Sequence, residues 1–194
     1  MPKIAFFINP TIRHFKKIEI DIQHHFLNQD YQFFISEYSG HFLTLPKRAV
    51  EEGFTHFIAV GGDGTLNEIV NGLIEAFRTE NGYDWERISQ IKIGILPSGS
   101  GNDFIKNLGY TTIDELQSLI AKDSSALVDV GFAEFLNREK QKAERFFINV
   151  SDVGIGGEVV ISKERLPLVF PGDVNYFIAI LSTFLMYKKK TIKV

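Results

Sequence analysis

The sequence predicts an α/β fold, with a mostly parallel sheet that has helices on both faces, followed by an incomplete, β-rich second domain. Three observations predict it. Short apolar runs alternate with helical patterns through the first half of the chain. The clearest helical pattern, 66–77, has apolar residues at the spacing of a core-facing stripe. After residue 128 the pattern changes to short strands around a charged turn, which is typical of a hairpin.

Each element of the first part has its own pattern. Strands are predicted where the apolar runs are short, at 4–8, 31–35, 55–60 and 91–96. Helices are predicted where apolar residues recur three or four positions apart, at 15–27, 42–52 and 66–77. Gly53 is expected to be the C-cap of the second helix, and the polar segment 81–87 is expected to be a loop. Strands that alternate with helices in this way indicate crossover units and a parallel sheet.

A domain boundary is predicted near Ser125, which gives a first domain at 1–124 and a partial second domain at 125–194. The second domain is predicted to contain strands and helices at 128–132, 145–150, 155–163 and 174–187. The alternating run at 188–194 would be a strand without a partner. An unpaired edge strand favours association, so a homo-oligomer formed by strand pairing or exchange is a hypothesis.

Composition excludes several classes of protein. The chain of 194 residues is 44% hydrophobic and 23% charged, and its 18 Phe imply a sizeable apolar interior. Cysteine is absent, which excludes disulfides and Cys-based zinc sites and favours the reducing cytoplasm. The net charge of -3 argues against nucleic acid as a partner. The apolar stretch 174–187 is too short to span a bilayer.

The strongest chemical signal is the segment Gly61-Gly62-Asp63-Gly64-Thr65-Leu66-Asn67-Glu68, between a predicted strand and the clearest helix. Its glycines let the backbone turn sharply and approach a ligand closely. Thr65 and Glu68 match a capping box, so we expect Thr65 to be the N-cap. The unpaired N–H groups of a helix start form an anion site, and open α/β sheets bind ligands at the carboxyl ends of strands.

Asp63 is the unusual residue of this turn. The turn has neither the Gly-Lys-Ser/Thr of a P-loop nor the third glycine of a dinucleotide fingerprint. A carboxylate beside phosphates needs a cation or a mobile proton, so Asp63 indicates a metal-bound nucleotide. The sequence does not define the metal ligands. The structural alternatives are an Asx-turn at Asp63 and an ordinary strand-to-helix turn.

A second turn, Pro97-Ser98-Gly99-Ser100-Gly101-Asn102-Asp103-Phe104, follows another predicted strand. Its hydroxyl groups and glycines offer donors and close approach, while Asn102 and Asp103 are suited to cap a helix or bind a ligand. Neither serine has the flanking glycines of a nucleophile elbow. This motif is weak alone, but two such turns at neighbouring strand ends would face one cleft.

Together the two turns resemble the catalytic domain of the bacterial diacylglycerol kinase family, which includes soluble lipid kinases. The resemblance extends through the whole chain by way of Asn9-Pro10, Ser36-Glu37, Val128-Asp129-Val130-Gly131 and Phe147-Ile148-Asn149-Val150. It implies an NAD-kinase- and diacylglycerol-kinase-like fold and transfer of the γ-phosphate of ATP to a lipid hydroxyl, with Mg²⁺ on the phosphates. It also implies a lipid substrate, transient contact with a membrane surface, and a cytoplasmic, membrane-peripheral location.

The same resemblance implies a set of site residues. Asp63 would lie at the centre of phosphate transfer as the catalytic residue. Asp103 and Asp129 would be polar supports near the cleft. The nucleotide site as a whole would comprise Asn9, Pro10, Thr11, Ser36, Gly61, Gly62, Asp63, Gly64, Thr65, Leu66, Asn67, Glu68, Ser100, Asn102, Asp103 and Asp129.

The sequence departs from the family pattern at several points. Ile12-Arg13 stands where the family has Ser-Gly, and Ser36 and Ser100 replace threonines. The family's second domain continues to an Asp-Gly-Glu base that this sequence lacks, so we expect the general base to be missing. Two other interpretations stay open. One is an enzyme related to NAD kinase or phosphofructokinase, and the other is a nucleotide- or lipid-binding module without catalysis.

Overall fold

The structure, a computed structural model, describes residues 2–98, 102–137, 139–151, 154–165 and 172–187. The chain divides into two compact units, Met1–Asn149 and Val150–Val194. The hairpin that opens the predicted second domain is therefore part of the first unit. The domain boundary near residue 125 stays a prediction about the sequence.

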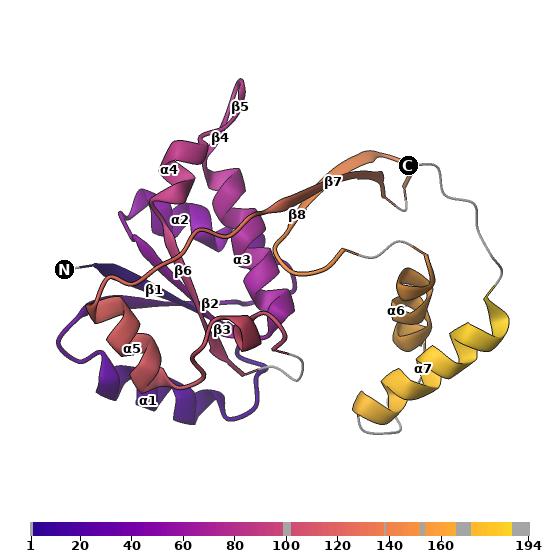
Figure 1. Ribbon diagram of the computed structural model, residues 1–194, viewed down its shortest axis with the longest axis horizontal. Helices are drawn as coiled ribbons and strands as arrows, with labels where there is room; N and C mark the ends of the chain where they lie inside the picture. Colours follow the sequence, from indigo (N-terminus) through magenta and orange to yellow (C-terminus); the bar gives the residue numbers. More distant parts are fainter. Residues whose placement is uncertain (1, 99–101, 138, 152–153, 166–171, 188–194) are drawn as a thin grey trace. The chain divides into compact units, whose positions relative to one another are not determined.

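A parallel sheet of four strands forms the centre of the first unit, in the order β2-β1-β3-β6 (Figure 1). The strands are β1 (Lys3–Ile8), β2 (Asp30–Ile35), β3 (His56–Gly61) and β6 (Lys92–Pro97). Each pair is parallel, and Gly61 at the end of β3 lies beside Pro97 at the end of β6. The predicted α/β fold with a parallel sheet is confirmed, and the turns after these strands share one edge.

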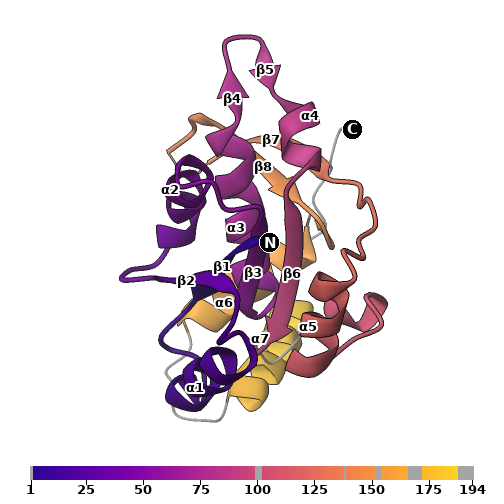
Figure 2. The same cartoon turned by 90° about the vertical axis from the view of Figure 1, so that its left-hand side faces the viewer.

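Helices cover both faces of the sheet, as Figure 2 shows. One face carries α1 (Phe15–His25) and α5 (Ile113–Ala121), and the other carries α2 (Leu45–Glu51) and α3 (Asp63–Ala76). Successive residues of β1 point to opposite faces, so Phe6 contacts Phe26 while Phe7 stacks on Phe34. Both faces of the sheet are buried by aromatic side chains, which accounts for the many phenylalanines of the sequence.

Local sequence signals explain where the observed elements differ from the prediction. The helix expected at 42–52 splits into a 3₁₀ turn η1 (His41–Leu43) and α2, because Pro46 in the first turn of α2 does not allow a continuous helix. The expected loop at 81–87 is wrong in part, since β4 (Arg78–Thr79), β5 (Gly82–Tyr83) and α4 (Trp85–Ser89) occupy this region.

Helix α5 and the short 3₁₀ turn η2 (Ile105–Asn107) were not predicted. A signal for α5 was present in the sequence. The Thr112 hydroxyl accepts the N–H of Glu115, and the Glu115 carboxylate accepts the N–H of Thr112, which makes a complete capping box. The backbone and hydroxyl hydrogen bonds from Thr111 and Thr112 also lower the pKa of the Glu115 carboxyl.

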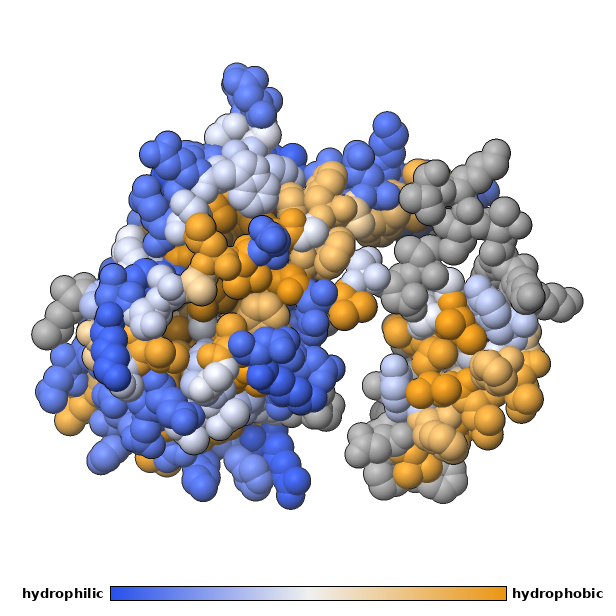
Figure 3. All heavy atoms as spheres, in the orientation of Figure 1, coloured by the Kyte–Doolittle hydropathy of each residue, from blue (hydrophilic) through white to orange (hydrophobic). Residues whose placement is uncertain are grey.

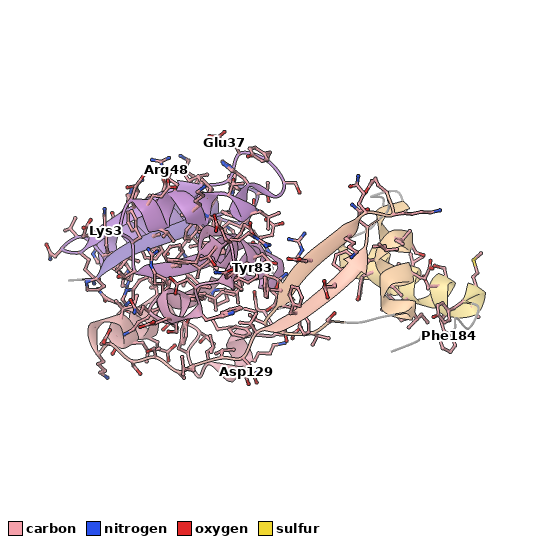
Figure 4. All side chains as sticks on the ribbon, turned by 90° about the horizontal axis from the view of Figure 1, so that it is seen from above. Lys3, Glu37, Arg48, Tyr83, Asp129 and Phe184 are labelled. Atoms are coloured by element: carbon pink, nitrogen blue, oxygen red, sulfur yellow. The ribbon has the colours of Figure 1, made fainter. Side chains whose placement is uncertain are left out.

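The predicted hairpin is present as β7 (Gly131–Leu136) and β8 (Lys142–Phe147), with strand positions a few residues from those expected. The end of β8 packs on the rest of the first unit through an aromatic cluster in which Tyr83 and Trp85 contact the ring of Phe146 edge to face. Arg78 extends this contact, because it pairs with both Glu75 and Glu144. Figure 4 shows Tyr83 beside the base of the hairpin.

The second unit consists of α6 (Ile155–Arg165) and α7 (Gly172–Met186). The Thr183 hydroxyl donates to Ser162 at 2.9 Å, which ties the two helices together. Apolar side chains cover much of α7 (Figure 3), and Phe177, Phe184 and Leu185 are exposed. In the described parts of the chain, no helix combines the length and apolarity that crossing a membrane requires. The predicted strand at 188–194 lies outside the described residues.

Gly72 permits close contact between α3 and η1, and its replacement is expected to destabilise the fold. A Cβ at this position would lie 2.6 Å from the carbonyl oxygen of Phe42 and 2.8 Å from that of Leu43. Because both are backbone atoms, Gly72→Ala should lower the free energy of unfolding by about 1–3 kcal/mol, measured by urea denaturation. Gly157→Ala in α6 is the control, since that position is open and the helix should tolerate it. An unchanged midpoint for Gly72→Ala would contradict the observed packing.

Buried His56 should make stability depend on pH. Burial, followed by the charge of Lys92, lowers the pKa of His56 below its ordinary value of about 6.5, with Asp123 opposing. Among the described residues its Nε2 atom has no hydrogen-bond partner. His56 therefore binds a proton more readily in the unfolded chain than in the folded one. The contribution of neutral His56 to the free energy of unfolding is complete above pH ~6.5 and is lost as the pH falls.

We expect the free energy of unfolding to fall by up to about 1.4 kcal/mol per pH unit below this value. Urea denaturation at several pH values should show a weaker dependence in His56→Gln. The exposed His24 provides the control, since His24→Gln should retain the wild-type dependence. Equal pH dependence in all three proteins would exclude His56 as the cause.

Candidate functional site

Two of the turns predicted to bind a ligand meet at the carboxyl edge of the sheet. The first follows β3 and the second follows β6, and these strands are neighbours. The N–H of Ser98 donates to the carbonyl of Gly61 at 3.0 Å, which continues the strand pairing into the turns. The parallel sheet thus brings together residues far apart in the sequence, as expected for turns at the ends of neighbouring strands.

Helix α3 begins earlier in the chain than the sequence predicted. Its N-cap is Gly62, in an extended conformation, and Asp63 is its first residue. The predicted capping box of Thr65 and Glu68 is therefore wrong. Thr65 lies within the first turn, where its side chain covers Gly61 rather than capping the helix.

The helix start retains the features of an anion site. Within the described residues no side chain caps α3. The N–H groups of a first helical turn have no partners inside the helix, and the helix dipole adds partial positive charge. These N–H groups, presented at the carboxyl edge of a sheet, suit the oxygens of a phosphate group.

The glycines of the first turn have different roles. A Cβ on Gly61 would lie 2.5 Å from the Thr65 hydroxyl, so this glycine is required by the protein's own packing. A Cβ on Gly64 would meet no atom within 4 Å. Gly64 is exposed in the first turn of a helix, where alanine would usually be more stable. The fold does not require glycine at this position, but a ligand that approaches the backbone closely would.

Asp63 connects the two turns. Its carboxylate oxygens accept the backbone N–H of Asp103 at 2.9 Å and that of Phe104 at 3.0 Å. Hydrogen bonds to an ionised carboxylate are about twice as strong as neutral ones, so this contact fixes the second turn relative to α3. The proposed Asx-turn is not what the structure shows, since both partners of Asp63 belong to the other turn.

The structure describes Pro97 and Ser98 at the start of the second turn and the residues from Asn102 onward, and the predicted residue Ser100 lies outside the described residues. Asn102 has a φ of 52°, a left-handed conformation that asparagine tolerates better than most residues. The carboxylate of Asp103 pairs with Lys106, so its side chain is directed to its own short helical turn. These contacts support the shape of the turn.

Two further predicted segments lie at the same edge. The Asn9 side-chain oxygen accepts the N–H and hydroxyl of Thr11 at 3.0 and 2.7 Å, which closes a turn containing Pro10. Ser36 is buried and donates its N–H to the carbonyl of Ile8. In the strand order β2-β1-β3-β6, the Asn9–Thr11 turn follows the strand next to β3, and Ser36 follows the strand one further away.

Other predicted residues are placed differently. Leu66 is 1% exposed and belongs to the core, so only its backbone is available to a ligand. Asn67 and Glu68 lie on the second turn of α3 and are partly exposed. Asp129 is exposed in the segment before β7, and no hydrogen bond among the described residues joins it to the Asp63 turn. Figure 4 shows it on the opposite side of the first unit from Glu37.

The arrangement fits a nucleotide phosphate better than a protein-bound metal cage. Within the described residues, no three side chains of His, Cys, Asp or Glu gather into a metal-binding group. Mg²⁺ in phosphate-transfer sites usually needs one or two carboxylates, because water and the substrate phosphates provide the other ligands. Asp63 is the carboxylate of the first turn that meets this requirement.

The fold and site define a class: a parallel α/β domain with a glycine-flanked helix start at the carboxyl edge of its sheet. This chain belongs to the diacylglycerol kinase catalytic domain family, which its residues 3–133 match. It is 33% identical over 133 residues to a diacylglycerol kinase of Staphylococcus carnosus, covering 68% of this chain and 37% of that protein. It is 30% identical over 141 residues to a diacylglycerol kinase of Staphylococcus aureus, covering 72% and 38%.

A solved structure shows the same fold. The crystal structure of a diacylglycerol kinase from Bacillus anthracis aligns with a TM-score of 0.51 and 22% identity, covering 94% of this chain and 56% of that one. The chain thus spans less than two-fifths of the length of the two curated relatives and just over half of the solved one. The resemblance identified in the sequence is confirmed at the level of family and fold.

Proposed function

We propose that this chain is the nucleotide-binding part of a lipid kinase that transfers the γ-phosphate of ATP to a lipid hydroxyl, with a diacylglycerol-like lipid as acceptor. The observation that carries the proposal is the pair of hydrogen bonds from the backbone of Asp103 and Phe104 to Asp63, which connects the two glycine-rich turns at the start of α3. Phosphoryl transfer depends mainly on positioning and charge neutralisation, and these turns provide the positioning.

Each part of the proposed site has a defined task. The N–H groups at the start of α3 would bind phosphate oxygens, and Gly64 would allow the backbone to approach them. Ser36 and the Asn9–Thr11 turn would contact the rest of the nucleotide. Mg²⁺ would neutralise the phosphate charge, and Asp63 would hold it or its water ligands through lone pairs that the two N–H groups do not use.

One observation favours a second candidate, a nucleotide-binding module without catalysis. Both oxygens of Asp63 already accept backbone N–H groups, an arrangement that suits a structural carboxylate as well as a catalytic one.

Calorimetry and turnover on the same sample separate these candidates. ATP with Mg²⁺ should bind in calorimetry under either proposal. Phosphate transfer to dispersed diacylglycerol, measured with labelled ATP, would support the kinase, whereas binding without transfer would support the module. Transfer to NAD or fructose 6-phosphate in parallel assays would instead favour the related small-molecule kinases. No binding of ATP would contradict both proposals.

We also propose contact with a membrane surface and a cytoplasmic, membrane-peripheral location, and the exposed apolar residues of α7 support the membrane contact. Phe184 is 71% exposed, and a surface aromatic of this kind gains free energy when it enters the bilayer interface. The protein should sediment with vesicles of phosphatidylcholine and diacylglycerol, and Phe184→Ser should weaken this binding. Ile20→Ser, at a comparably exposed apolar position on α1, should not.

The alternative outcome is association between copies of the chain. If vesicles do not bind the protein while light scattering gives a mass above that of one chain, self-association through apolar surface is favoured over membrane contact.

A further inference from the structure

The side chain of Asn71 forms a buried polar link between α3 and strand β8. Its Nδ2 donates to the carbonyl of Phe146 at 2.9 Å, and its Oδ1 accepts the N–H of Phe146 at 2.9 Å. The same Nδ2 also donates to the carbonyl of Asn67 at 2.8 Å, one turn earlier in the helix. All the hydrogen-bonding groups of this amide are therefore engaged, in a residue that is 8% exposed.

The hydrogen bonds between Asn71 and Phe146 lie along the edge of β8 that faces away from β7. Phe146 lies opposite Phe132 of β7. In an antiparallel strand the N–H and C=O of one residue point to the same side, and those of Phe146 both point to Asn71. Asn71 thus binds β8 as a neighbouring strand residue would, along the edge that β7 leaves open.

The helix that carries Asn71 also carries the phosphate-binding turn. Asp63 and Asn71 lie on the same helix, and their separation in sequence corresponds to about 12 Å of rise along α3. Gly72 holds this part of α3 against the backbone of η1 with no room for a side chain. Because a helix moves largely as one rigid element, a displacement of the first turn of α3 would also be felt at Asn71.

We propose that Asn71 is a positioning residue that couples the phosphate-binding turn of α3 to strand β8, so that nucleotide binding and docking of the hairpin stabilise each other. This inference rests on the proposed function, since it assumes a nucleotide at the start of α3. Coupling of two sites is reciprocal. A substitution that releases β8 must therefore weaken nucleotide binding, although Asn71 itself lies about two turns away from the phosphate-binding turn.

The test compares Asn71→Leu with Tyr110→Phe in the full chain. Leucine has a similar volume but leaves the N–H and C=O of Phe146 without a partner. Tyr110→Phe removes a buried hydrogen bond of the same kind, from the N–H of Ile95 in β6 to the tyrosine hydroxyl at 2.9 Å, and this bond does not involve β8. Both variants should lose stability, so stability alone does not distinguish a positioning role.

Two measurements distinguish a positioning role of Asn71 from a loss of stability alone. In Asn71→Leu we expect the Kd for ATP with Mg²⁺ to rise at least about fivefold, the lower end of typical coupling. We also expect ATP to no longer increase the protection of the Phe146 amide from hydrogen exchange, measured by NMR. Tyr110→Phe should keep the wild-type Kd and the increase in protection.

Asn71→Asp keeps the test valid if Asn71→Leu does not fold. Its ionised carboxylate cannot donate to the Phe146 carbonyl, while the protonated form can, so lowering the pH should restore part of the ATP-dependent protection in this variant alone. Wild-type Kd and protection in both Asn71 variants would overturn the inference and leave the proposed function intact. No ATP binding by the wild-type chain would overturn both.

Discussion

Gly64→Ala is expected to weaken ATP binding while the fold stays as stable as that of the parent chain or becomes more stable. A Cβ at this position meets no protein atom within 4 Å, and glycine in a helix is about 0.5–1 kcal/mol less favourable than alanine. Thermal unfolding should therefore show an equal or higher midpoint. The same methyl group would project into the space that a phosphate must enter to reach the helix N–H groups.

We expect the Kd for ATP with Mg²⁺ to rise about five- to 150-fold, because steric conflicts of this size cost about 1–3 kcal/mol and 1.4 kcal/mol is a factor of ten. Gly61→Ala is the matched control from the same turn. Its Cβ would lie 2.5 Å from the Thr65 hydroxyl, so its first effect should be a loss of stability. Unchanged ATP affinity in Gly64→Ala would show that no phosphate lies over this residue.

This division of roles among the glycines was not accessible from the sequence. Periodicity predicted the strands and the clearest helix, since buried faces impose regular spacing on apolar residues. It also predicted that the turn after β3 would lie beside the turn after β6, since sequential βαβ units build one parallel sheet. Which glycine is needed for packing and which is left open depends on the position of Thr65, and that follows from where the helix begins.

The N-cap error has the same origin. Thr65 and Glu68 match the capping-box pattern, but extended Gly62 starts the helix earlier and moves Thr65 into the first turn. The opposite error occurred at α5, where Thr112 and Glu115 form a true capping box that was not recognised. A short local pattern therefore indicates a helix start only if the preceding backbone permits it.

The contacts of Asp63 and Asn71 were inaccessible for another reason. Each side chain binds backbone groups of residues distant in the sequence, at Asp103 and Phe104 for Asp63 and at Phe146 for Asn71. Backbone donors and acceptors do not depend on the identity of the side chain, so no sequence motif could indicate these partners. The sequence resemblance gave Asp63 a chemical role, and the structure adds a positioning role to it.

Asp63→Ala is expected to disconnect the two turns and thereby weaken nucleotide binding as well as any phosphate transfer. Hydrogen bonds to a charged group contribute about 1.5–3 kcal/mol each when well shielded, and Asp63 accepts two in a partly exposed site. The variant should lose stability of about 1.5–3 kcal/mol. The amides of Asp103 and Phe104 should lose protection from hydrogen exchange.

Binding of ATP in the absence of metal distinguishes a positioning role of Asp63 from a role in the chemistry. If Asp63 acts only on a metal or proton, Asp63→Ala should abolish transfer but leave the Kd for ATP in EDTA and the protection of both amides unchanged. If it holds the second turn, that Kd should rise about tenfold or more, since the lost hydrogen-bond energy exceeds 1.4 kcal/mol. Asp63→Asn should be intermediate, because an amide oxygen can still accept one N–H while the amide nitrogen opposes the other.

Asp84→Ala is the matched control for this experiment. Asp84 is also a carboxylate that accepts a backbone N–H, that of Arg87 at 3.1 Å, but it caps α4. Its loss should reduce stability by about 1 kcal/mol without changing nucleotide affinity. Equal effects of Asp84→Ala and Asp63→Ala on the Kd would mean that affinity follows global stability. A selective effect of Asp63→Ala would mean that one carboxylate holds both turns of the proposed site in place.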